Sequence, residues 1–165
     1  MFFRNLFFYT LPEISAVTDE ALESALESAA LKPVGALAMQ SRGFVPPLGE
    51  SGSLLQRIES SLWLCLGGED RILPAAVVQR ECQLKIAELE QAKGHPLGKR
   101  ARAQLKQETL DTLMPRAFVK PSRLNAVINR KRGFIAIDSS SAKAAEALLS
   151  KLREALGSFP ALPLQ

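Results

Sequence analysis

The sequence is poor in the residues that build metal sites and disulfide frameworks. Its 165 residues contain one histidine and two cysteines. His95 lies in a Gly/Pro loop with no cysteine near it, which excludes a zinc site of ordinary Cys/His spacing. Cys65 and Cys82 show no regular spacing, so we expect no disulfide and two buried free thiols.

Arrangements that carry catalysis are also missing. There is no glycine-rich phosphate loop, and we interpret Gly67-Gly68 as part of a turn. Ser139, Ser140 and Ser141 have no accompanying base in the sequence and are expected to cap a helix. No tight cluster of carboxylates suggests a two-metal nuclease. We therefore predict that the protein is not an enzyme and has no catalytic residue, metal or cofactor.

Long apolar runs are absent as well. No stretch approaches the roughly 18–20 apolar residues that span a bilayer. The opening MFFRNLFFYTL is interrupted by Arg4 and Asn5, and no small-residue cleavage site follows it. The hydrophobic fraction of 47% and the charged fraction of 23% are those of an ordinary globular domain. We expect a cytoplasmic, nucleoid-associated protein without membrane contact.

Hydrophobic periodicity predicts an α+β fold, with a mainly antiparallel sheet, packed helices and an inserted helical hairpin. The predicted strands are 2–10, 36–46, 117–128 and 134–138. The first of them carries apolar groups on both faces, Phe2 and Phe3 among them. A further pair of strands is predicted as a hairpin over 62–73 that turns at Gly67–Asp70. The predicted helices begin after Thr18, at Pro74, at about residue 99 and after Ser141, the last ending at Gly157. We expect one domain, in which 1–73 and 116–165 form the sheet and helix core and 74–115 projects as a helical hairpin.

Positive charge is concentrated in the middle of the chain. The net charge of the whole chain is +4, whereas residues 80–132 alone carry +8. Each basic cluster in this stretch could be an ordinary solvated face, but several clusters without compensating acids favour a surface for a polyanion. Nothing resembles a recognition helix that reads base edges, so we expect sequence-independent contacts to phosphates. The candidate DNA-binding residues are Lys93, Lys99, Arg100, Arg102, Lys106, Arg116, Lys120, Arg123, Arg130, Lys131 and Arg132.

Phe118 lies among these cations and admits two interpretations. Phenylalanine is commonly interior, so Phe118 could be a core residue of its strand. Alternatively, it belongs to a subunit contact beside the DNA path, with Arg116 and Lys120 flanking it on the same side of an alternating strand. The sequence alone leaves both interpretations open.

Several stretches resemble the N-terminal part of the RdgC family of bacterial recombination-associated proteins. They are FFRNLFFYTL at the start, KPVG at 32–35, GFVPPLG at 43–49, RILPAAVV at 71–78, KIAELE at 85–90, LMPRAF at 113–118, FIAID at 134–138 and SAKAAEALLSKLREALGSFPALPL at 141–164. These stretches follow one another along essentially the whole chain.

The resemblance implies a homodimeric protein that binds double-stranded DNA without sequence preference. It further implies antagonism of the recombinase RecA, achieved by occupying the DNA. Family members are longer than this chain and are in places described as exonucleases, for which this sequence shows no carboxylate cluster. The alternative is a protein-interaction module that binds a full-length relative or a recombination enzyme without binding DNA itself.

Overall fold

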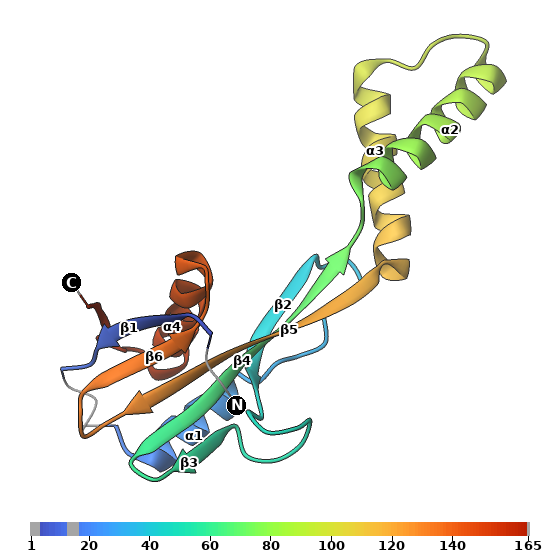
Figure 1. Cartoon of the computed structure of the whole chain (residues 1–165). Coiled ribbons are helices and arrows are strands. Elements are labelled where there is room, and N and C mark those ends of the chain that lie inside the picture. The colour runs from blue at the N-terminus through green and yellow to red at the C-terminus, as the bar shows by residue number, and fades with distance from the viewer. Residues whose placement is uncertain (1–3, 13–16, 165) are drawn as a thin grey trace. The chain divides into compact units, whose positions relative to one another are not determined.

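The computed structural model of the chain describes residues 4–12 and 17–164 (Figure 1). Within them it confirms the predicted α+β class, and the strands form a seven-stranded sheet in which every pair of named strands with an assigned register is antiparallel. The elements are β1 Leu6–Thr10, α1 Asp19–Ser28, β2 Gln40–Val45, β3 Leu55–Ile58, β4 Ser61–Ile72, α2 Ala75–Lys93, α3 Lys99–Leu113, the 3-10 turn η2 Met114–Arg116, β5 Phe118–Asn129, β6 Phe134–Asp138, α4 Ala142–Leu156 and β7 Leu162–Pro163. The strand order is β2-β4-β5-β6-β1-β7, and β3 pairs with β4.

The chain divides into two compact units. The first, here called the core unit, contains residues 1–32, 42–68 and 122–165. The second, the hairpin unit, contains residues 33–41 and 69–121, including α2, α3 and the adjoining ends of β4 and β5. The expectation that the whole chain behaves as one domain stays a prediction.

In the core unit, α1 and α4 supply the apolar side chains that bury one face of the sheet (Figure 1). Alternate residues of the strands point to the same face, which is why Ile135 and Ile137 of β6 meet the helices while Ala136 does not belong to this cluster. Burying each large aliphatic side chain contributes about 1.5–3 kcal/mol. The large hydrophobic side chains fully buried in this layer are Leu11, Leu22, Leu26, Phe44, Leu64, Ile128, Ile135, Ile137, Leu148, Leu149 and Leu152.

Capping residues delimit both helices of the core unit as predicted. The Thr18 hydroxyl accepts a hydrogen bond of 3.1 Å from the Ala21 amide, and the Ser141 hydroxyl accepts one of 3.3 Å from the Ala144 amide. Gly157 ends α4 in the left-handed conformation, with a φ of 73°. The buried free thiols of Cys65 and Cys82 also confirm the prediction for the two cysteines, and burial raises the pKa of Cys65.

The predicted hairpin turn at Gly67–Asp70 is wrong, because β4 continues through it as one strand of 12 residues. A Cβ at Gly67 would lie 2.6 Å from Val45 Cγ1, and one at Gly68 would lie 2.6 Å from Ser122 Oγ. The two glycines therefore allow neighbouring side chains to approach the strand, rather than allowing it to reverse. The actual hairpin joins β3 to β4.

The expectation that the first strand is covered on both faces is also wrong within the described residues. Tyr9 is buried on the helix side, whereas Leu6 and Phe8 on the opposite side are exposed. Phe8 instead makes an edge contact with Phe134 of β6, with ring centroids 5.7 Å apart. Residues 2 and 3 of the predicted strand lie outside the described residues.

Candidate nucleic-acid interface

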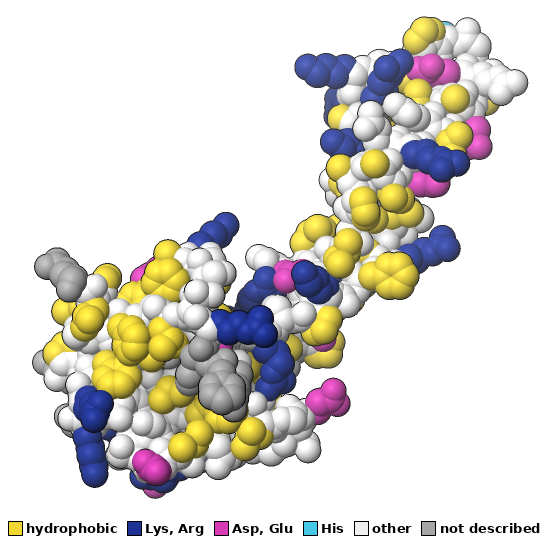
Figure 2. All heavy atoms as spheres, in the orientation of Figure 1, with side chains coloured by type: hydrophobic (Ala, Val, Ile, Leu, Met, Phe, Trp, Pro, Cys, Tyr) yellow, Lys and Arg dark blue, Asp and Glu magenta, His cyan; other side chains and the backbone are white. Residues whose placement is uncertain are grey.

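The predicted DNA-binding residues divide between the two units. Seven of the eleven belong to the hairpin unit and four to the core unit. Figure 2 shows dark-blue basic side chains around the helical hairpin, with magenta acidic ones interspersed among them.

Three cations gather where the two helices of the hairpin are joined. Lys93 is the last residue of α2, and Lys99 and Arg100 are the first two residues of α3. Gly98 precedes α3 without a side-chain cap, and the first turn of α3 contains no acidic residue. The free amides of a helix N-terminus attract anions, so lysine and arginine there disfavour the folded helix slightly and favour a bound phosphate.

The acidic residues of α3 do not neutralise its cations. Glu108 accepts a hydrogen bond of 2.9 Å from the Gln104 amide group, and Asp111 accepts one of 2.8 Å from the Gln107 amide group. Both pairs are four residues apart, which places them on the same side of the helix. Glutamine therefore serves as the partner of each carboxylate, and neither carboxylate pairs with a cation of the helix.

Arg102 has a different role from its neighbours. Its guanidinium lies 2.8 Å from the Glu90 carboxylate of α2 and also donates a hydrogen bond of 3.0 Å to the Leu97 carbonyl. The Leu97 amide, in turn, donates a hydrogen bond of 2.8 Å to Glu90. The bond from Leu97 first, and then Arg102, lower the pKa of Glu90. Arg102 thus closes the hairpin loop, and its placement does not support a phosphate contact.

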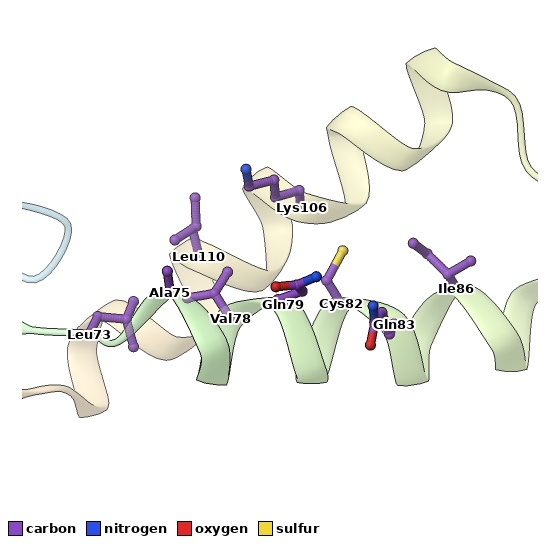
Figure 3. Close-up of a pocket in the computed structure, with 9 residues that line it drawn as sticks. All are labelled: Leu73, Ala75, Val78, Gln79, Cys82, Gln83, Ile86, Lys106 and Leu110. Atoms are coloured by element: carbon purple, nitrogen blue, oxygen red, sulfur yellow. The ribbon is translucent and has the colours of Figure 1, made fainter.

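Lys106 lies at the edge of an apolar groove between α2 and α3 (Figure 3). The groove has a volume of about 500 Å³. Figure 3 shows the side chains of Val78, Cys82 and Ile86 pointing from α2 toward α3. The aliphatic stem of a lysine can line such a surface while its ammonium group stays in water. Lys106 therefore lies beside the contact between the helices, which Arg102 crosses to reach Glu90.

Phe118 is 84% exposed, which rules out the core interpretation for this chain alone. Lys120, two residues along β5, shares its side of the strand. Arg116 is part of η2 and not of the strand, so the predicted alternation holds for Lys120 and not for Arg116. All three side chains are exposed, and Val119 between them is also 41% exposed.

In the core unit, two of the four predicted cations bind the protein itself. The Arg123 guanidinium donates to the carbonyl of Pro46 and thereby holds the PPLG loop. The Arg130 guanidinium lies 2.9 Å from the Asp19 carboxylate and donates to the Val17 carbonyl. Their placement does not support phosphate contacts. The side chains of Lys131 and Arg132, in the turn before β6, are exposed.

Arg57 is a cation that charge counting along the chain does not select. It precedes the turn between β3 and β4, in a part of the sequence where acids outnumber bases. Its guanidinium pairs with Asp19, the same carboxylate that holds Arg130. The sheet brings these residues together although more than seventy positions separate Arg57 from Arg130, so no local pattern in the sequence could have joined them.

Metal-binding clusters and membrane-spanning helices are both absent from the described ranges. Residues 4–12 and 17–164 include no group of three or more His, Cys, Asp or Glu side chains able to hold a metal ion. In the same ranges no helix has both the length and the hydrophobicity needed to cross a bilayer.

The fold and these residues define an α+β protein that carries exposed basic side chains on a helical hairpin. The chain belongs to the RdgC family: the family model described as "Putative exonuclease, RdgC" matches residues 1–165. Proteins named recombination-associated protein RdgC are 48% identical in Xanthomonas oryzae pv. oryzae (strain MAFF 311018) and 47% identical in Xylella fastidiosa (strain 9a5c). Each alignment covers 99% of this chain and 54% of the relative. The chain therefore spans about half the length of the curated relatives it matches.

Proposed function

We propose that this protein binds double-stranded DNA without sequence preference and modulates recombination by occupying the DNA. The observation that carries the proposal is a set of exposed cations in the hairpin unit, here called the hairpin cations. None of them has a hydrogen bond or ion pair through its side chain among the described residues. They are Lys93, Lys99, Arg100, Lys106, Arg116 and Lys120.

The hairpin cations suit phosphates better than bases. Lysine and arginine contacts to phosphates fix a protein on the duplex without reading its sequence. Six such contacts would release counterions with a slope of about −5.4 in log K against log salt. A fourfold rise in salt would then weaken binding about 10³-fold. A steep dependence of DNA affinity on salt concentration is therefore the result that the proposal predicts.

The relatives are named recombination-associated proteins, which supports a role in recombination. We place that role at the DNA, in the nucleoid, where a protein covering the duplex restrains the action of RecA. The proposal includes a homodimer with Phe118 at a subunit contact. Its support is the 84% exposure of Phe118, because aromatic side chains are enriched among interface anchors.

An electrophoretic shift assay with two duplexes of unrelated sequence tests the proposal. We expect both duplexes to bind with equal affinity, and both complexes to weaken about 10³-fold between 50 and 200 mM salt. If the protein is instead an interaction module, as the exposed Phe118 would also allow, it will shift neither duplex at either salt concentration. A preference for one duplex that persists at high salt would contradict phosphate binding.

We propose that this activity is not enzymatic, although the family model carries the description of an exonuclease. The same duplexes, labelled at one end and incubated with the protein and Mg²⁺, test this directly. We expect the label to stay at full length over the time that a control nuclease needs to degrade the duplex. Progressive shortening that EDTA abolishes would show that the protein is a nuclease.

A further inference from the structure

A hollow in the core unit lies between the turn joining β3 to β4 and the turn joining β5 to β6. Its volume is about 550 Å³, and five side chains line it. Three of them are cationic and one is a carboxylate. The lining residues are Arg57, Glu59, Ser60, Arg130 and Lys131.

The two arginines of the hollow share one carboxylate. Asp19, in the first turn of α1, forms an ion pair with the guanidiniums of both Arg57 and Arg130. Lys131 has no ion pair among the described residues. Burial first, and then the neighbouring charge of Arg57, lower the pKa of Arg130, although Glu20 opposes this. An additional anion would relieve the crowding of like charges.

The two arginines differ in their freedom to meet a ligand. The Arg130 side chain is only 22% exposed and is fixed by Asp19 and the Val17 carbonyl. The Arg57 side chain is 67% exposed. A guanidinium has five N–H donors, and the Asp19 pairing is the one interaction of Arg57 within the described part of the chain. Arg57 can thus hold Asp19 and still present donors to the hollow.

The remaining residues supply the shape and a neutral donor. Ile58 and Ser61 pair across the hairpin, so Glu59 and Ser60 form a two-residue turn. Glu59 has a φ of 51°, a conformation that costs a residue other than glycine about 1–2 kcal/mol. The tight turn places Ser60, whose hydroxyl can donate a hydrogen bond, in the lining beside the basic groups.

We propose that this hollow binds a phosphate group through Arg57, Ser60 and Lys131, with Arg130 as the fixed positive charge behind them. Arginine and lysine together with a hydroxyl are the donors that phosphate prefers in proteins. If the protein binds DNA as proposed above, the phosphate belongs to the duplex backbone, and the core unit then adds contacts to those of the hairpin cations. Free inorganic phosphate has the same chemistry and is the other possible source.

The test compares the variants Arg57→Gln and Lys131→Gln with Lys143→Gln in the full-length chain. Lys143 is an exposed residue of α4 in the same unit and lies outside the hollow. We expect each variant of the hollow to reduce the magnitude of the salt slope for duplex binding by about 1, and Lys143→Gln to leave it unchanged. If the salt slope of duplex binding in both variants of the hollow equals that of Lys143→Gln, the ligand of the hollow is not the duplex backbone.

Titration with inorganic phosphate, followed by amide NMR at the ionic strength of a chloride control, separates the two sources. We expect saturable shifts of the Ser60 and Lys131 amides, which the double variant Arg57→Gln/Lys131→Gln loses. Shifts no larger than those with chloride, together with an unchanged salt slope, would overturn the site altogether. If the wild-type chain binds no duplex at any salt concentration, the proposed function fails, and the phosphate titration alone decides whether the hollow is an anion site.

Discussion

Replacing Arg100 by glutamine is expected to stabilise the protein and at the same time to weaken its binding to DNA. Arg100 is the second residue of α3, where its charge opposes the positive end of the helix dipole. Removing a misplaced charge from a terminal turn stabilises a helix by about 0.3–1 kcal/mol. For a chain of 165 residues this corresponds to a rise of about 1–4 °C in the melting temperature.

DNA binding should change in the opposite direction. Loss of one phosphate contact reduces the salt slope by about 0.9, from about −5.4 to about −4.5. The two measurements are thermal unfolding in the absence of DNA and the electrophoretic shift at several salt concentrations. Opposite signs in the two assays would not arise if Arg100 contributed only to the stability of the fold.

The chain offers a matched control in Lys143→Gln. Lys143 is the second residue of α4 and is exposed, so its charge also faces the positive end of a helix. It should gain similar stability and lose no affinity for DNA. The reasoning would be refuted if both variants lowered the affinity equally, or if Arg100→Gln left the salt slope unchanged.

Three further predictions concern Phe118, Gly43 and Glu90. Phe118→Ala should remain folded, because the side chain is exposed in the single chain, but should lose dimerisation and DNA binding together; light scattering would contradict this if the variant remained dimeric. Gly43→Ala should destabilise the protein by about 1–3 kcal/mol in a denaturant titration, because the new Cβ would lie 2.4 Å from Leu31 Cα. Gly35→Ala is the control and should be tolerated in the same titration, because its new Cβ would lie 3.7 Å from Ala38 Cβ. The pKa of Glu90 is lowered in the folded protein. The stabilisation by its carboxylate should therefore be complete above the pKa of the unfolded carboxyl and vanish as the pH falls through the pKa of the folded state. The melting temperatures of wild type and Glu90→Gln should accordingly differ at neutral pH and converge in acid.

Local patterns in the sequence predict most of the helices of this fold. Thr18 and Ser141 cap their helices through their side chains, and Gly157 ends α4, because each of these interactions spans only a few residues. The two helices of the hairpin are likewise separated by a Gly/Pro-rich loop that the sequence makes evident. A short stretch of chain contains all the information that such features need.

Features that depend on packing between distant segments are not predictable in this way. Gly67 and Gly68 look like a turn in the sequence, yet they lie within β4 because side chains of β2 and β5 need the space. Arg102 and Arg130 look like free cations until the fold brings Glu90 and Asp19 to them. Arg57 could not be selected at all, because the other two cations of the hollow, Arg130 and Lys131, come from a different part of the chain.

The salt dependence of duplex binding, measured for the wild type and for a variant with Lys93, Lys99, Arg100 and Lys106 changed to glutamine, tests the central claim most directly. Changing four cations of the core unit instead, Arg4, Lys143, Lys151 and Arg153, provides a control of equal charge. We predict that the slope falls from about −5.4 to about −1.8 in the first variant and changes little in the control. Equal slopes in all three proteins, or a wild type that binds no duplex even at low salt, would contradict the claim that the hairpin cations hold DNA.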